Sequence, residues 1–370
     1  MTEGPYKLPE GWRWVRLGEV CEVWDALRKP VKKKDRRLGD VPYCGANGII
    51  DYVDGYTHVG EFVLLAEDGG FYGPGEPSAY MMNGRFWANN HVHVLRGKSG
   101  YLVNQFLYYW LVFCDLRPFL TGTTRPKLTQ TAMHSIPIPL PPLEEQRRIV
   151  ARVEELMSRI REAKRLRQEA KEEAERLWQS ILSETFPKPG TELPEGWRWV
   201  RLGEVFRLKN GKFIRAGELK SEGKVPVYGS NGLLGFTAIP LLMEGRTIVI
   251  GRVGACGAVN VVNAPCWISD NAMFVAEWFI ECDIEYIALS LHNIDFSSFV
   301  KKGAQPSISQ EVVYNAPIPL PPLEEQRRIV AYLQDVQGKI RALKEVQAQT
   351  EAELKRLEQA ILDKAFRGEL

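Results

Sequence analysis

Two stretches of the chain carry apolar residues in alternating steps of four and three positions. Each stretch begins after a Pro-Pro pair, at Pro141-Pro142 and Pro321-Pro322, and its first turn contains carboxylates, which the positive end of a helix dipole favours. Sustained spacing of this kind with charged flanks predicts two long helices with a coiled-coil seam. The expected seam residues are Ile149, Val153, Leu156, Ile160, Leu177 and Ile181 in the first helix, and Ile329, Leu333, Val336, Ile340, Leu343, Leu354, Leu357 and Ile361 in the second.

The two helices are expected to pair with each other in antiparallel orientation. Each spans about 40 residues and is therefore about 60 Å long. A domain must fit between the end of the first helix and the start of the second, and an antiparallel pair places those two ends at opposite poles. If Ile149 faces Ile361, the small Ala174 lies opposite the larger Val336, as dense packing favours. A parallel pair is the alternative and would lose this match.

The regions outside the helices are typical of mixed α/β domains. Short runs with high β-propensity, such as Phe62–Leu65, His91–Leu95 and Thr247–Ile250, are separated by Gly, Pro and Asn residues that favour turns. Helical apolar spacing occurs once in each region, at Asn104–Leu116 and Ile284–Leu291. We therefore expect two α/β domains of about 130 residues.

The chain is an internal duplication. The segment LPEGWRWVRLGEV occurs at Leu8 and again at Leu193, and PIPLPPLEEQRRIVA occurs at Pro137 and again at Pro317. Between these anchors, VPYCGANGI corresponds to VPVYGSNGL. A repeated supersecondary unit sets the architecture. The expected boundaries are 1–137 for the first domain, 138–188 for the first helix, 189–317 for the second domain and 318–370 for the second helix.

Composition narrows the class of protein only slightly. The 370 residues carry a formal net charge of +2, and no apolar run reaches the length of about 18 residues that a membrane span needs. The six cysteines are scattered without a Cys-x-x-Cys pair, which predicts free thiols in a reducing cytoplasm. His91 and His93 alternate along a predicted strand without a third ligand nearby in the sequence, so no metal site is assigned.

No catalytic motif is recognisable. The sequence lacks a Walker A loop, an Asn/Asp-Pro-Pro-aromatic methyltransferase tetrapeptide and a strand-linked G-x-G-x-x-G loop, and nothing in it resembles a nucleophile triad. We therefore expect a chain without a catalytic site of its own. An enzyme with an unrecognised active site is one alternative, and a coiled-coil scaffold with two peptide-binding domains is another.

The repeated segments resemble the conserved regions of the specificity (S) subunits of type I restriction–modification complexes. The resemblance rests on PIPLPPLEEQRRIVA opening a long charged helix after a variable domain, and on LPEGWRWVRLGEV, YCGANG and VYGSNG, which are similar to the starts of target recognition domains. It implies two α/β target recognition domains held apart by an antiparallel coiled coil with pseudo-two-fold symmetry.

The resemblance also implies the partners. Double-stranded DNA would be read as two short blocks separated by unread bases. Two methyltransferase (M) subunits would dock on the helices, with restriction (R) subunits outside them, in the cytoplasm. S-adenosylmethionine, ATP and Mg²⁺ would be used by those partner subunits, and this chain would hold no cofactor.

Clusters of cations are the candidates for contact with DNA phosphates. The densest is a run of Arg28, Lys29, Lys32, Lys33, Lys34, Arg36 and Arg37, opposed only by Asp35. The second domain has a thinner run of Arg207, Lys209, Lys212 and Arg215 spread over nine residues, and a further basic spot in each copy consists of Arg125 with Lys127 and of Lys301 with Lys302. The alternatives are a solvated loop or a protein-docking surface for the long run, and an ordinary turn for the other spots.

One position distinguishes the two domains most clearly. Alignment of the apolar strands Val63–Ala66 and Thr247–Ile250 places Asp68 opposite Arg252. A carboxylate accepts from the amino groups of cytosine or adenine, whereas arginine donates two hydrogen bonds to guanine, so the two half-sites are expected to differ. The alternative is that each residue satisfies polar groups within its own domain.

The copied tryptophans are expected to be structural. Trp12 and Trp14, repeated as Trp197 and Trp199, could stack on bases, but they alternate with other residues in an identical segment. A half-buried strand explains them better, because identical residues cannot distinguish two different half-sites.

Overall fold

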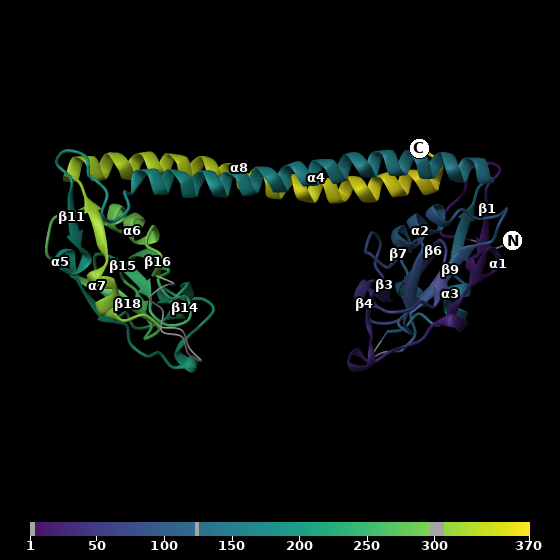
Figure 1. Cartoon of the computed structure of the whole chain (residues 1–370), viewed down its shortest axis with the longest axis horizontal. Coiled ribbons are helices and arrows are strands. Elements are labelled where there is room, and N and C mark those ends of the chain that lie inside the picture. The colour runs from purple at the N-terminus through teal and green to yellow at the C-terminus, as the bar shows by residue number, and fades with distance from the viewer. Residues whose placement is uncertain (1–3, 123–125, 297–306) are drawn as a thin grey trace. The chain divides into compact units, whose positions relative to one another are not determined.

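The computed structural model describes residues 4–122, 126–296 and 307–370. It divides into two compact units: unit 1 is Met1–Gln168 with Val346–Leu370, and unit 2 is Glu169–Glu345. Each unit contains one domain and a part of both long helices, α4 (Leu143–Thr185) and α8 (Leu323–Arg367) (Figure 1).

The domain of unit 1 contains two four-stranded sheets and a two-stranded ribbon. In the first sheet every pair of strands is antiparallel, and all five residues of its strand β6 are buried, as expected for the run FVLLA. In the second sheet β3 and β8 run parallel. The strands, in sheet order, are β2 (Cys21–Val23), β9 (Val92–Gly97), β6 (Phe62–Ala66) and β7 (Ala79–Met82); β4 (Gly48–Val53), β3 (Leu38–Gly45), β8 (Arg85–Ala88) and β5 (His58–Val59); and β1 (Arg13–Arg16) with β10 (Pro137–Leu140).

Helix α2 (Asn104–Phe113) connects the first sheet of unit 1 to the long helices. It contacts β6, β7 and β9, and its Phe106 and Trp110 share one core with Phe366 of α8. Figure 1 shows α2 between the sheet and the paired helices. Two short helices, α1 (Leu17–Val20) and α3 (Gln130–His134), flank the ribbon.

Unit 2 repeats this plan strand for strand, with no counterpart of β5 among the strands that the structure describes. Its parallel pair is β13 with β17. The elements are β12 (Phe206–Asn210), β18 (Ala272–Trp278), β15 (Arg246–Gly251) and β16 (Val259–Asn263) in one sheet; β14 (Gly232–Thr237), β13 (Val225–Gly229) and β17 (Trp267–Ile268) in the other; the ribbon of β11 (Arg198–Arg201) and β19 (Pro317–Leu320); and the helices α5 (Leu202–Val205), α6 (Ile284–His292) and α7 (Gln310–Asn315). The predicted mixed α/β domains in two copies are confirmed.

The long helices pair in antiparallel orientation within each unit. In unit 1 the start of α4 and the end of α8 share a core, and Lys164 Nζ lies 2.8 Å from Glu358 Oε1. In unit 2 Leu182, near the end of α4, shares a core with Leu333, near the start of α8. The predicted antiparallel orientation is confirmed. No helix within the described ranges combines the length and the apolar character that a membrane crossing requires.

The start of each long helix is fixed by a buried glutamine. The side chain of Gln146 accepts from the backbone N–H of Val103 (2.9 Å) and donates to the carbonyl of Tyr101 (2.9 Å), both just before α2. Gln326 accepts in the same way from the N–H of Asp283 (2.8 Å), just before α6. A buried amide is costly unless it is hydrogen-bonded, so these contacts hold each helix start in register with the preceding domain.

The predicted seam is wrong at three positions. Leu177, Leu343 and Leu357 are 54%, 41% and 48% exposed, whereas Trp178, one residue after Leu177, packs against the core of unit 2. A strict heptad drifts around a straight helix by about 20° per heptad, so after four heptads the inward position has moved by most of one residue. The other predicted seam residues are buried or half-buried: Ile149, Val153, Leu156, Ile160, Ile181, Ile329, Leu333, Val336, Ile340, Leu354 and Ile361.

The seam correction predicts opposite outcomes for two adjacent substitutions. Trp178→Ala removes a ring that packs against the core and should lower the free energy of unfolding by about 2 kcal/mol. Leu177→Ala, the matched control, should change it by less than about 0.5 kcal/mol, because that side chain is largely in solvent. Chemical denaturation of the full chain measures both. Equal losses of unfolding free energy for the two variants would instead support the seam predicted from the sequence.

Candidate nucleic-acid interface

The cationic run of unit 1 lies between β2 and β3. Its Arg36 is bound inside the domain: Nη1 lies 2.8 Å from Asp51 Oδ2, and the guanidinium lies 4.2 Å from the centroid of the Tyr43 ring. The hydrogen bond from Arg36 lowers the pKa of the Asp51 carboxyl. Arg36 therefore anchors the run to β4, and it does not present its charge to solvent as the sequence predicted.

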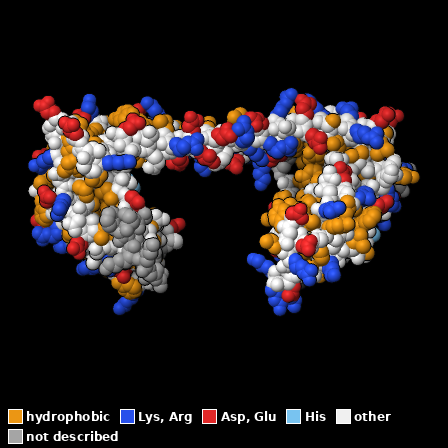
Figure 2. All heavy atoms as spheres, viewed as in Figure 1, with side chains coloured by type: hydrophobic (Ala, Val, Ile, Leu, Met, Phe, Trp, Pro, Cys, Tyr) orange, Lys and Arg blue, Asp and Glu red, His pale blue; other side chains and the backbone are white. Residues whose placement is uncertain are grey.

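Five cations of the same run do face solvent. None of these side chains forms a salt bridge with any residue of the described ranges, so their positive charge is open to a partner. Figure 2 shows Lys and Arg side chains gathered at the end of unit 1 that is farthest from its part of α4. The exposed residues are Lys29, Lys32, Lys33, Lys34 and Arg37.

Arg28 belongs to a buried charge network instead. Its Nη1 donates to the Glu67 carboxylate and to the Val92 carbonyl (2.8 Å), and its Nη2 lies 3.2 Å from Asp25 Oδ2. The Lys127 Nζ lies 2.6 Å from the other oxygen of Glu67. Both cations therefore compensate a buried carboxylate, so Arg28 is not the free phosphate contact that the sequence predicted. The side chain of Lys127 is 45% exposed, and its contact with phosphate stays a prediction.

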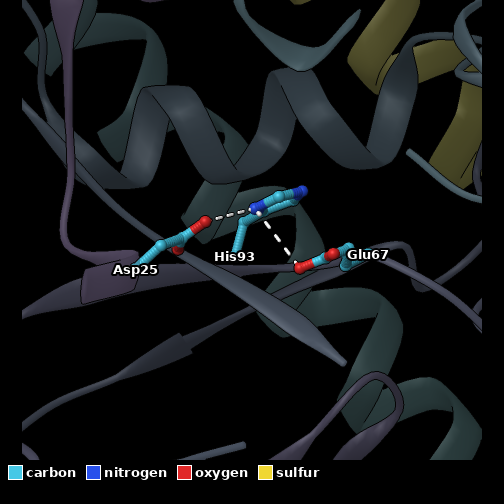
Figure 3. A group of neighbouring side chains, drawn as sticks. All are labelled: Asp25, Glu67 and His93. Carbon is cyan, nitrogen blue, oxygen red and sulfur yellow. Dashed lines mark hydrogen bonds and ion pairs between the residues drawn. The ribbon is translucent and has the colours of Figure 1, made fainter. Parts of the chain in front are cut away.

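His93 completes this network (Figure 3). Its Nε2 lies 2.8 Å from the Leu128 carbonyl and its Nδ1 lies 2.6 Å from Asp25 Oδ2, with Glu67 Oε2 at 3.8 Å. Both ring nitrogens therefore face oxygen atoms of the same domain, and the imidazole packs inside the network.

Ligand atoms of the three residues Asp25, Glu67 and His93 lie within 4.8 Å of one another, as in a small metal site. The positive charge that these carboxylates require is already supplied by Arg28 and Lys127. The arrangement therefore has the chemistry of a structural ion network at the end of β6.

Burial and hydrogen bonding oppose each other at Glu67. Burial alone would raise the pKa of its carboxyl, but hydrogen bonds from Lys127 and Arg28 outweigh that effect and lower the pKa below its usual value. The ionised form is therefore the one that the folded domain stabilises.

The sequence alignment that placed Asp68 opposite Arg252 is wrong by one residue: the N–H of Leu128 donates to the Glu67 carbonyl as the N–H of Ile308 donates to the Arg252 carbonyl, so Glu67 corresponds to Arg252. Asp68 and Arg252 both have partners within the protein. Asp68 Oδ1 lies 2.5 Å from His91 Nδ1, and Arg252 Nη1 donates to the Asp270 carbonyl at 3.1 Å. Arg252 is half-buried and retains further N–H donors. The loop that contains Asp68 lies beside the turn after β3, because Asn47 Nδ2 donates to the Gly69 carbonyl at 3.0 Å. Base contact by Asp68 or Arg252 stays a prediction.

The remaining candidates divide between exposed residues and undescribed ones. Lys209 and Lys212 are exposed and, with Arg246, line a cavity of about 440 Å³ beside β12 and β15. Arg125, Lys301 and Lys302 lie outside the described residues. The tryptophans are half-buried, as predicted from their alternation: Trp14 and Trp199 lie in the ribbon strands β1 and β11, and Trp12 and Trp197 lie directly before them.

Residues 9–172 and again 194–353 match the family described as type I restriction modification DNA specificity domain. The chain belongs to this family. It is 33% identical over 347 residues to a protein of Haemophilus influenzae named as a type I restriction enzyme specificity subunit, with 86% of each chain covered. The MjaVIII specificity subunit of Methanocaldococcus jannaschii is 24% identical over 398 residues, covering 96% of this chain and 93% of that protein.

Solved structures agree with the family. A chain of a type I R-M system, solved to explain complex assembly and conformational transition, is 34% identical, with a TM-score of 0.78 over 99% of this chain and 100% of that one. The HsdS subunit of Thermoanaerobacter tengcongensis is 35% identical, with a TM-score of 0.59 and all of both chains covered. The two repeats of this specificity-family chain are thus DNA specificity domains joined by paired helices.

Sequence reasoning about this specificity-family chain missed Asp25, Glu67 and Gln146 as structural residues. The one available signal was an acidic residue directly after the apolar strand FVLLA, where a carboxylate at the end of a buried strand needs a cation. The partner cations could not be chosen, since Arg28 and Lys127 look like their exposed neighbours in sequence.

The network predicts a pH-dependent effect of Glu67→Gln. The folded-state pKa of Glu67 lies below the unfolded value of about 4.5, so its ionised form stabilises unit 1 above that pH, and the stabilisation is lost as pH falls through the folded-state pKa. At pH 7 the variant should have an unfolding free energy about 3 kcal/mol lower than that of the wild type. This difference between the two proteins should narrow below a pH of about 4.5. Denaturant titrations from pH 3 to pH 8 measure it.

The matched control is Glu10→Gln, because Glu10 is exposed and forms no ion pair within the described residues. It should leave the unfolding free energy unchanged at every pH. If Glu67→Gln lowers the unfolding free energy by the same amount at pH 3 and at pH 7, the ionised Glu67 carboxylate does not stabilise unit 1 through this network.

Proposed function

We propose that this chain is the DNA-reading subunit of a type I restriction–modification complex, in which each domain reads one half of a bipartite, asymmetric site. The observation that carries the proposal is the group of five exposed cations at the end of unit 1 that form no salt bridge with the described residues, in a chain whose two repeats are DNA specificity domains. Exposed cations of this density are the footprint of phosphate contact.

The asymmetry of the proposed site rests on the divergence between the two domains. Glu67 and Arg252 occupy corresponding places directly after the aligned ends of the buried strands β6 and β15, and opposite charges cannot make the same contact. The dense cationic run also has only a thinner counterpart in unit 2, at Arg207, Lys209, Lys212 and Arg215. Two unlike readers fit a site that is not palindromic.

The helices are proposed to set the number of unread bases and to dock two methyltransferase subunits. The segment PIPLPPLEEQRRIVA is identical in both copies, and its Glu144, Arg147 and Arg148 are exposed, as are the corresponding residues that begin at Glu324. Identical exposed residues on two unlike domains suit a partner that binds twice. DNA repeats about every 34–36 Å, so a stiff helical spacer can hold two readers in phase.

In this proposal the chain has no catalytic site. Methyl transfer and DNA cleavage belong to the M and R subunits, which would use S-adenosylmethionine, ATP and Mg²⁺, and the complex would act on double-stranded DNA in the cytoplasm. The competing function is a protein scaffold that presents two peptide-binding domains, which would show no salt-dependent affinity for duplex DNA.

The test is the triple substitution of Lys32, Lys33 and Lys34 by alanine. These side chains are exposed and unpaired within the described ranges, so their loss should weaken binding to specific and unrelated duplexes by similar factors. The slope of log K against log salt should flatten by up to about three, close to one for each lost phosphate contact. Fluorescence anisotropy over a salt series measures the slope.

A matched control removes the same charge elsewhere. Arg152, Arg159 and Arg165 on α4 each form an ion pair with a glutamate of the same helix, so their triple alanine variant should keep the wild-type slope. If both variants flatten the slope equally, net charge rather than the cationic run governs binding. If the wild-type chain shows no salt dependence, the scaffold is favoured.

A further inference from the structure

The duplication allows corresponding places in the two units to be compared. The buried glutamines fix the correspondence: Gln146 bonds to the N–H of Val103 and Gln326 to that of Asp283, each just before the connecting helix. Helices α2 and α6 therefore align so that Trp110 corresponds to Ser290, and Phe113 to Asn293.

In unit 1 this place is filled by aromatic rings. Trp110 is 2% exposed, and its ring centroid lies 5.1 Å from that of Phe366 and 5.7 Å from that of Trp14. Phe113 stacks on Phe366 at 5.3 Å. The indole N–H of Trp110 donates to the Pro137 carbonyl at 2.9 Å. An indole with an N–H donor thus completes the packing between α2, the end of α8 and β10.

In unit 2 the same place is a cavity. Phe186, the counterpart of Phe366, remains and contacts Tyr286 at 5.5 Å, but the positions of Trp110 and Phe113 hold the small polar residues Ser290 and Asn293. These residues line a cavity of about 590 Å³, within the range of small-ligand and anchor pockets.

The wall of this cavity offers a specific hydrogen bond. Pro317, the counterpart of Pro137, lines it, and no described side chain donates to the Pro317 carbonyl. Exposed Lys188 and Glu311 stand among the lining residues, so the apolar interior has a charged rim, as interface pockets commonly do.

We propose that this cavity, formed by Phe186, Ser290, Asn293 and Pro317, accepts an indole side chain from the protein partner that docks on the start of α8. Unit 1 shows which group fits: an indole that packs on the phenylalanine and donates its N–H to the proline carbonyl. Tryptophan anchors that enter pockets are a main source of binding energy at protein interfaces.

The location indicates a protein partner as the source of the indole. Pro317, Ile318 and Pro319 line the cavity and belong to the segment that is identical in both copies. This part of the proposal rests on the proposed function, in which a methyltransferase subunit docks on that segment. Because Trp110 of the chain itself fills the place in unit 1, only the partner bound at unit 2 would insert its own tryptophan, and the two docking positions would differ.

Indole is the probe for the pocket itself. Calorimetric titration of the full chain with indole should show one binding site, and the S290W/N293F variant, which copies unit 1, should bind indole about tenfold more weakly or not at all. S290A is the matched control, because it keeps the space open and should bind as the wild type does. If S290W/N293F does not fold, W110S/F113N in unit 1 tests the same geometry by opening a second site.

The second arm measures assembly with the methyltransferase subunit. Filling the cavity should lower the affinity of one of two docking positions about tenfold, whereas S290A should leave both unchanged. Equal indole binding by the wild type and S290W/N293F would overturn the pocket. If the cavity binds indole but S290W/N293F has no effect on assembly, the cavity accepts a free small molecule and not a tryptophan of the partner. Failure of the wild-type chain to bind DNA with salt dependence would instead count against the proposed function, because indole binding does not depend on it.

Discussion

The buried amide of Gln146, repeated as Gln326, is the contact on which the arrangement of each unit depends. It joins the first turn of a long helix to the backbone just before the connecting helix of the preceding domain, at 2.9 Å in unit 1 and 2.8 Å in unit 2. Rotation or sliding of the helix would break this hydrogen bond and leave a buried amide unpaired, which is costly. The apolar residues of α4 and α8 then extend each domain core into the helix pair, so domain and spacer form one packed body in each unit.

Much of this architecture could be predicted from periodicity and repetition, because both are properties of the backbone pattern. The helix pair and the two α/β domains follow from apolar spacing and from the copied segments. The face of the helix was harder to predict: a heptad count selects Leu177, whereas the 3.6-residue turn brings Trp178 inward. Contacts distant in sequence could not be predicted. Arg28 and Glu67 are 39 positions apart, and no local signal separates Arg28 from the exposed lysines that follow it.

The two units share the same ribbons and helix starts and differ in the loops and in the connecting helices. Identical ribbon and helix-start segments hold both domains, and the ion network at the end of β6 shows how charge can be used internally for structure. The loops that follow β6 and β15 carry opposite charges, and the connecting helices place Trp110 in one unit and Ser290 in the other. Divergence on a shared framework is what a reader of two unlike half-sites requires, because the framework sets position while the loops select bases.

The central claim is that the two domains read different halves of one DNA site. The most direct measurement is to map methylated bases in the DNA of cells that express this chain together with the proposed methyltransferase subunit. The account predicts one sequence of two short, unlike blocks separated by a fixed number of unread bases. A single uninterrupted block, or a palindrome with two equal halves, would contradict it.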